Sequence, residues 1–144
     1  MSDYDDKLQT ESWLAYFRRK NRFADVMLTA WSNIEYSVDM LFTNEFGLSL
    51  DDDKAKILLR MNFLTKLDFL KDYHLVTDTE YQAIRSFDRF RNQVFHRDGW
   101  VYVHLSATER DNAMDTAVEV VGMLTNAIKR RGSRTNPSVI RGQP

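Results

Sequence analysis

The chain has only two prolines, Pro137 and Pro144, and both lie close to its C-terminus. Glycine is also scarce, with five residues in the whole chain. Because proline breaks a helix and glycine weakens one, an interior almost free of both favours helices throughout. The apolar residues agree, since they recur at helical spacing. We therefore expect an all-α fold in which four to five helices pack as an antiparallel bundle.

The first long apolar stripe predicts a helix from Phe23 to Phe46, and Gly47 is expected to stop it. Ser49 and the acidic run 51–53 offer caps for the stretch that follows. A short helix is also expected before this stripe, over residues 8–19. The N-terminal half of the chain is thus predicted to be helical almost without interruption.

Apolar spacing and capping residues predict helices in the middle of the chain. Residues 57–70 form either one helix or two helices with a bend near Asn62. Thr77 and Glu80 have the spacing of a capping box, in which each residue bonds the backbone of the other. The helix that this box opens is expected to run to about His96.

The remaining residues predict one more helix. Asp98-Gly99 is expected to break the preceding helix, and the alternation over 100–105 is typical of an extended segment. Ser106-x-x-Glu109 is a second capping box, and Gly132 is expected to end its helix after a run of cations. The inward positions predicted for this helix are Ala113, Ala117, Val120, Val121, Leu124 and Ile128.

This pattern divides the chain into three parts. Residues 1–20 form an acidic N-terminal segment that includes the short helix, residues 21–132 form one helical domain, and residues 133–144 form a disordered tail. The acidic start lacks the basic and apolar regions of a secretory signal. We expect no such signal.

Composition excludes several classes of function. The net charge of -1 argues against a protein that coats duplex DNA with positive charge. The absence of cysteine excludes disulfides and thiolate metal sites, and it fits a reducing cytoplasm. No apolar run approaches the roughly 20 residues that a membrane-spanning helix requires. We expect a cytoplasmic protein that needs no metal and no cofactor.

One short stretch carries residue types suited to chemistry on RNA. It is the run Arg91-Asn92-Gln93-Val94-Phe95-His96, at the end of the helix that the first capping box opens. An arginine holds a phosphate with a planar fork of donors, and a histidine moves a proton near neutral pH. Together these two residue types are the minimum needed to cleave RNA without a metal ion.

The helical wheel places Arg91 among core-facing residues. Arginine is rarely buried unless it is paired, so Arg91 is expected either to extend its head to an edge or to meet a carboxylate. Glu35, which lies beside apolar residues of the long early helix, is one hypothetical partner. The alternative is that Glu35 reaches solvent from the edge of its stripe.

Arg91 and His96 would point about 140° apart on one continuous helix. They converge on one atom only if the helix ends or bends between them, or if a symmetric partner supplies a second copy of the pair at an interface. The other side of this helix is a polar stripe on which Arg85 and Arg89, with Arg97 beyond them, are candidates for binding RNA. A solvated basic face is the simpler explanation of the same stripe.

The run Arg91-Asn92-x-x-Phe95-His96 resembles the Arg-x4-6-His motif of HEPN domains, including the polar residue that follows the arginine. HEPN domains are small all-α bundles whose long early helix carries a phrase similar to Ile34-Glu35-Tyr36. The stretch from Phe63 to Thr77 resembles the helix that precedes the motif, and it is also similar to the mannitol-repressor-like branch. The resemblance covers roughly residues 22–130.

The resemblance implies a metal-independent endoribonuclease, of a kind often found as a toxin or a defence effector. Such proteins usually form homodimers in which two copies of the motif face each other, and an antitoxin or another protein regulates some of them. Carried over, Arg91 would bind and stabilise the scissile phosphate, and His96 would transfer a proton as the ribose 2′-OH attacks. Asn92 would support the pair, either by orienting it or by contacting the phosphate. The expected product is a 2′,3′-cyclic phosphate. Other members of the family are non-catalytic modules that bind proteins or nucleotides.

Simpler explanations cover the other conspicuous residues. His74 and His104 lack metal-ligand spacing and are interpreted as structural. Trp31, Trp100 and Tyr102 could stack bases, but packing in the core or an interface is the preferred interpretation. A DNA-binding repressor is disfavoured, because no helix-turn-helix with a basic recognition helix is present. The two functions that stay open are the endoribonuclease and the non-catalytic module.

Overall fold

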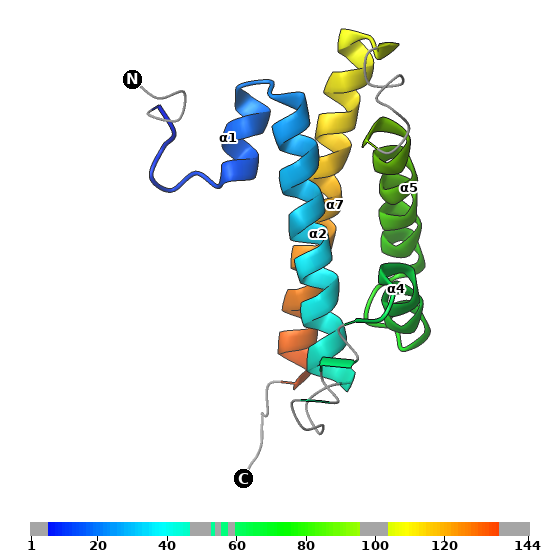
Figure 1. Ribbon diagram of the computed structural model, residues 1–144. Coiled ribbons are helices and arrows are strands. Elements are labelled where there is room, and N and C mark those ends of the chain that lie inside the picture. The colour runs from blue at the N-terminus through cyan, green and yellow to red at the C-terminus, as the bar shows by residue number, and fades with distance from the viewer. Residues whose placement is uncertain (1–5, 47–52, 54–55, 58–59, 96–103, 136–144) are drawn as a thin grey trace.

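The computed structural model contains helices and connecting segments that pack into one bundle (Figure 1). The residues that the structure describes are 6–46, 53, 56–57, 60–95 and 104–135, with the side chains of 133–135 excepted. Within these residues the bundle has five helices, which confirms the all-α prediction. They are α1 (Trp13–Arg19), α2 (Phe23–Phe46), α4 (Phe63–Asp72), α5 (Asp78–Phe95) and α7 (Ala107–Thr135).

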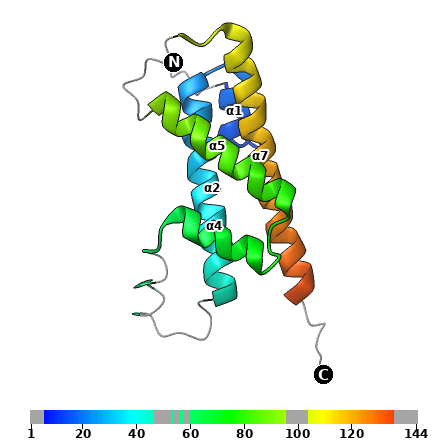
Figure 2. The same cartoon turned by 90° about the vertical axis from the view of Figure 1, so that its right-hand side faces the viewer.

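The long helices α2 and α7 lie side by side and form the axis of the molecule (Figure 1). By the colour gradient of Figure 1, α2 and α7 run in the same direction, and α1 and α5 run the opposite way. The turned view shows α5 crossing in front of α7 while α4 crosses the lower part of α2 (Figure 2). Two neighbouring helices that run in parallel need a long connection, and the segment with α4 and α5 supplies it.

Local capping fixes where the helices begin. Both capping boxes are present. The Thr77 N–H donates to Glu80 Oε1 at 2.8 Å and the Glu80 N–H to Thr77 Oγ1 at 3.1 Å, and the corresponding distances between Ser106 and Glu109 are both 3.0 Å. Asn62 caps α4, since its Oδ1 accepts from the Leu64 N–H at 2.8 Å. Of the two alternatives for residues 57–70, the one with a boundary near Asn62 is therefore the one observed.

The end of α7 differs from the prediction. Gly132 does not end α7, which continues to Thr135, so residues 133–135 of the predicted tail are helical. Arg131 explains the extension, because its guanidinium donates to the Asn44 carbonyl at 2.7 Å and anchors the last turns of α7 to α2. A helical glycine costs only about 1 kcal/mol and does not terminate an anchored helix.

Other boundaries also shift. The short N-terminal helix starts at Trp13 rather than at residue 8, because Ser12 caps it by accepting from the Ala15 N–H at 3.1 Å. His104 has helical backbone, so the extended segment expected over 100–105 is wrong at that residue. The rest of that segment up to residue 103, the stop at Gly47 and the cap at Ser49 lie outside the described residues.

The core lies between α2 and the helices around it. The stripe of α2 that the sequence predicted is buried, and its buried members are Phe23, Val26, Met27, Ala30, Trp31, Ile34, Val38, Leu41 and Phe42. On α7 the inward positions fall into a buried set and a partly buried set. The buried set is Met114, Ala117, Val120, Leu124 and Ala127, and the partly buried set is Ala113, Val121 and Ile128. Each fully buried large apolar side chain contributes about 1.5–3 kcal/mol.

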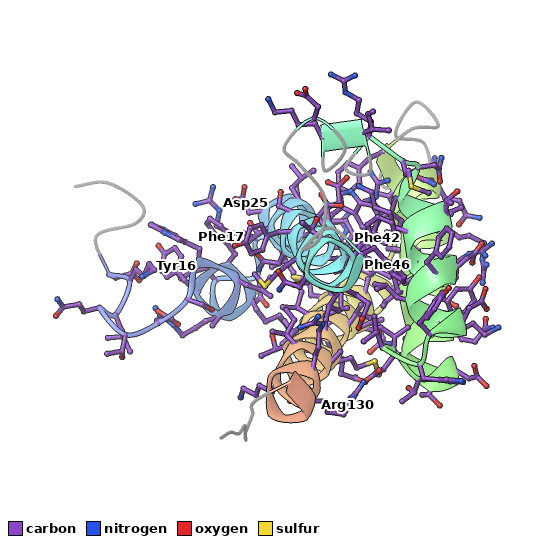
Figure 3. All side chains as sticks on the ribbon, turned by 90° about the horizontal axis from the view of Figure 1, so that it is seen from below. Tyr16, Phe17, Asp25, Phe42, Phe46 and Arg130 are labelled. Atoms are coloured by element: carbon purple, nitrogen blue, oxygen red, sulfur yellow. The ribbon has the colours of Figure 1, made fainter. Side chains whose placement is uncertain are left out.

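Ion pairs join the helices at both ends of the bundle. Arg130 donates to both oxygens of Glu80, at 2.8 and 2.7 Å, and so ties α7 to α5. Seen from below, Arg130 lies at the lower end of α7 while Phe42 and Phe46 lie at the lower end of α2 (Figure 3). At the other end Arg18 binds Asp111 and Asp115 at 2.7 and 2.9 Å, which fastens α1 to α7. Within the described part of the chain, no helix is both long enough and apolar enough to cross a membrane.

Candidate functional site

Arg91 lies near the end of α5 with its side chain largely buried. Only 16% of that side chain is exposed, although arginine seldom leaves water unless it has partners. The register of α5 explains this position, because Phe87 and Val94 lie one turn away on either side and both are buried. The sequence prediction that Arg91 falls on the core-facing side of its helix is confirmed.

Among the described residues, the guanidinium of Arg91 contacts an aromatic ring, an amide and a carboxylate. The Cζ atom lies 4.0 Å from the centroid of the Trp31 ring, which is within the range of a cation–π contact. The Nη2 atom donates to Asn92 Oδ1 at 2.9 Å and lies 3.4 Å from Asp88 Oδ1. A separation of 3.4 Å is long for an ionic hydrogen bond. The aromatic ring and the amide are therefore the closer supports.

Trp31 is itself fixed by aromatic neighbours. It is buried, with 8% exposed, and its ring centroid lies 4.9 Å from that of Phe63 on α4 and 6.3 Å from that of Phe87 on α5. These rings come from three different helices. The surface on which Arg91 rests is therefore part of the core, and the preferred interpretation of Trp31 as a packing residue is confirmed.

The carboxylate beside Arg91 belongs to Asp88 rather than to Glu35. Glu35 is exposed on α2, so the alternative in which it reaches solvent is the one observed. The register of α2 accounts for this difference. Trp31 precedes Glu35 by one turn, and its indole occupies the position on α2 that contacts α5. Asp88 reaches Arg91 from within α5, three residues earlier in the chain, which places the two side chains on one face.

Asn92 is in place as a support for Arg91, through the hydrogen bond at 2.9 Å. His96 and Arg97 lie outside the described residues, which continue along α5 only as far as Phe95. Two ways for Arg91 and His96 to converge were predicted, a helix end or bend between them and a second subunit, and both concern His96. They stay predictions.

The arginines of the polar stripe have local partners. Arg85 donates to Tyr81 Oη at 2.9 Å, and that hydroxyl donates to Asp68 Oδ1 on α4 at 2.5 Å. Arg85 is thus part of a link between α4 and α5. Arg89 is exposed and donates to Ser86 Oγ at 3.3 Å. Of these two arginines, Arg89 is the more accessible to a phosphate chain.

The other histidine and aromatic predictions concern residues away from Arg91. His74, which follows the C-cap residue Tyr73 of α4, has a positive φ of 61°, and its N–H donates to the Lys71 carbonyl at 3.0 Å. That backbone conformation terminates the helix, in agreement with a structural role. His104 is exposed, and Trp100 and Tyr102 lie outside the described residues.

Sequence reasoning missed the two residues that place Arg91 in the fold. Trp31 is on another helix, and no local pattern connects it to Arg91. Asp88 could have been found, because a carboxylate three residues before an arginine on a helix is a common ion-pair spacing. The resulting arrangement presents a guanidinium whose flat face is covered, while its donors lie in the plane at its edge. Such a group can bind a phosphate in two-point fashion.

No family model, no curated protein and no solved structure matches the chain. A function for it is therefore inferred from its own residues.

Proposed function

We propose that the chain is a metal-independent endoribonuclease of the HEPN type, which cleaves RNA by attack of the ribose 2′-OH on the adjacent phosphate. The observation that carries this proposal is the placement of Arg91. Its guanidinium lies against Trp31 near the end of α5, four residues before the last residue of that helix, Phe95. A restrained, partly buried cation of this kind suits the stabilisation of a phosphate on which charge builds up.

The roles of the motif residues follow from the chemistry of the step. His96 accepts the proton of the 2′-OH, and the resulting oxygen attacks phosphorus. The bond from phosphorus to the 5′-oxygen breaks, and the leaving oxygen takes up a proton. The products are a 2′,3′-cyclic phosphate and a 5′-hydroxyl. Arg91 neutralises the charge on the phosphoryl oxygens, and Asn92 holds Arg91 through its amide oxygen.

A homodimer fits this proposal for a geometric reason. On a continuous helix the side chains of Arg91 and His96 diverge by about 140°, so one helix does not bring both to the same phosphate. A symmetric partner would supply the missing member of each pair. The proposed enzyme works in the cytoplasm, as a toxin or defence effector held in check by an antitoxin or another regulatory protein.

A non-catalytic module that binds protein or nucleotide is the second candidate, and one observation favours it. The Arg91 guanidinium rests on a core tryptophan and lies beside the buried Asp88, an arrangement that a purely structural arginine would also adopt. On this second interpretation Arg91 contributes to folding and leaves RNA intact.

Cleavage of single-stranded RNA in the presence of EDTA separates the two functions. We expect the purified protein to cut the RNA and to leave 2′,3′-cyclic phosphate ends, and we expect Arg91→Ala and His96→Ala to lower the rate of cutting at least about 100-fold. Matched controls are Arg60→Ala and His104→Ala, which remove the same residue types from exposed positions elsewhere in the fold. These controls should cleave like the wild type.

The end-group analysis and the controls define the failures. Equal cleavage by wild type and both motif variants would assign the activity to a contaminant and reject the proposal. No cleavage by a folded wild-type dimer over a panel of RNAs, combined with loss of stability in Arg91→Ala, would establish the structural role of the second candidate.

A further inference from the structure

We infer that Trp31 is a positioning residue for Arg91, which holds the guanidinium plane in the orientation that meets the scissile phosphate. This inference rests on the proposed ribonuclease function and adds to it a residue from outside the motif. It is carried by the distance of 4.0 Å from Arg91 Cζ to the Trp31 ring, and by the burial of the two side chains.

Trp31 is suited to this task because stacking on its ring restrains the tilt of the guanidinium plane without occupying the donors that lie in that plane. An aromatic face attracts a guanidinium to lie over it, and tryptophan does so best among the aromatic residues. The donors of the guanidinium lie in its own plane, so stacking covers its face without consuming them. Asn92 and Asp88 both accept from the same nitrogen, Nη2, on one side of that plane. The plane and its rotation are thereby both set.

The rigidity of Trp31 makes the restraint effective. Phe63 and Phe87 pack against the indole from α4 and α5, with ring centroids at 4.9 and 6.3 Å. A flexible arginine would lose the freedom of several torsions when it binds phosphate. An arginine already stacked on a fixed ring has lost much of this freedom on folding. Less of the binding energy is then offset by ordering the side chain, and more of it stabilises the transition state.

Two measurements test this inference, and the first is independent of catalysis. The side-chain N–H resonance of Arg91, assigned by its disappearance in Arg91→Ala, should be shifted by the ring current of Trp31. Trp31→Leu should return the resonance to the position of an exposed arginine, and Trp31→Phe should retain part of the shift. Phe42→Leu is the matched control. It shrinks a buried aromatic residue on the same helix, at the end that packs with Phe46 and Phe69, and it should leave the resonance in place.

The second measurement is the kinetics of RNA cleavage. Trp31→Leu should lower kcat on the order of tenfold, the size of one partly desolvated cation–π contact, with KM and the pH profile unchanged. Trp31→Phe should recover most of this loss, and Phe42→Leu should match the wild type at a temperature where all variants are folded.

Each failure has its own signature. A resonance that Trp31→Leu leaves unmoved would overturn the positioning role whatever the kinetics, and so would equal losses of kcat in Trp31→Leu and Phe42→Leu. A wild type that shows the ring-current shift but cuts no RNA would overturn the proposed function, and the role of Trp31 toward a scissile phosphate with it.

Discussion

The two ends of α5 hold charged side chains in opposite ways. At its start, Glu80 accepts two hydrogen bonds from Arg130 and one from the Thr77 N–H, with distances between 2.7 and 2.8 Å. At its end, the guanidinium of Arg91 rests on an aromatic ring, and its only carboxylate neighbour among the described ion pairs is 3.4 Å away.

The difference separates a charge that holds the fold together from a charge suited to a ligand. A carboxylate with short bonds from an arginine and a backbone amide has its hydrogen-bonding capacity largely filled by the protein. The ion pair of Arg91 with Asp88, at 3.4 Å, is longer than that of Arg130 with Glu80, at 2.7 Å, so we expect the Arg91 pair to be the one that exchanges with an incoming phosphate. We therefore expect changes at the start of α5 to reduce stability and changes at its end to reduce activity.

The largest effect is expected from Arg91→Ala. Removing one cation that stabilises a developing charge should lower kcat by about 10²–10³-fold, roughly 3–4 kcal/mol in the transition state. Single-turnover cleavage of a labelled RNA measures this loss, and Arg60→Ala serves as the arginine control. If Arg91→Ala retained more than a tenth of the wild-type rate, the end of α5 would not be a catalytic site.

Arg130→Ala is the counterpart at the start of α5. It leaves the largely buried Glu80 without its bidentate partner. We expect a loss of about 1–2 kcal/mol in the free energy of unfolding, because water screens the half-exposed Arg130 and so weakens the pair. Urea denaturation measures the loss, with the exposed neighbour Lys129→Ala as control. Cleavage per folded molecule should stay at the wild-type level. A drop in kcat as large as that of Arg91→Ala would erase the distinction between the two ends.

Local spacing predicted the start of α5 because its contacts are local. The capping box needs only Thr77 and Glu80, three residues apart, and the same logic located the start of α7. The long stripe of α2 was also readable, since one buried face requires apolar residues at every turn. Most of the fold follows from such short-range rules.

The partners of the charged side chains could not be predicted, because they meet only in the packed bundle. Arg130 lies 50 residues from Glu80 in sequence, and its cationic run reads as an ordinary helix C-terminus. Trp31 meets Arg91 from another helix, whereas the sequence pattern offered Glu35 as a hypothetical partner, with a solvent-exposed Glu35 as the alternative. The continuation of α7 past Gly132 has the same origin, in the anchoring of Arg131 to the Asn44 carbonyl.

A smaller effect is expected from Thr77→Ala, which removes the oxygen that caps α5. The loss should be about 1 kcal/mol, as is typical for an N-terminal cap. Thermal unfolding measures it, and Thr79→Ala, an exposed change in the first turn of the same helix, is the control. Arg91 is held by Trp31 and Asn92 rather than by the cap, so kcat should not change. A loss of kcat would mean that the two ends of α5 are coupled through the helix.

The smallest effect is a dependence of stability on acid pH that belongs to Glu80. Burial alone would raise the pKa of Glu80, but the hydrogen bonds from Arg130 and from the Thr77 backbone outweigh it and hold the pKa below the ordinary value of 4.5. As the pH falls, Glu80 is therefore protonated at a higher pH in the unfolded chain than in the folded protein. The contribution of Glu80 is complete above the unfolded pKa and is lost as the pH falls through the lower folded pKa.

Glu80→Gln tests this dependence, because glutamine keeps the shape of the side chain and does not titrate. We expect the free energy of unfolding of the variant to fall less steeply than that of the wild type below about pH 4.5. Glu109→Gln, in the capping box of α7, is the comparison. The pKa of Glu109 is also lowered, by hydrogen bonds with Ser106, but no arginine bond contributes to that shift. Glu80→Gln should flatten the profile more than Glu109→Gln, and equal slopes would show that Arg130 adds nothing to what the capping box provides.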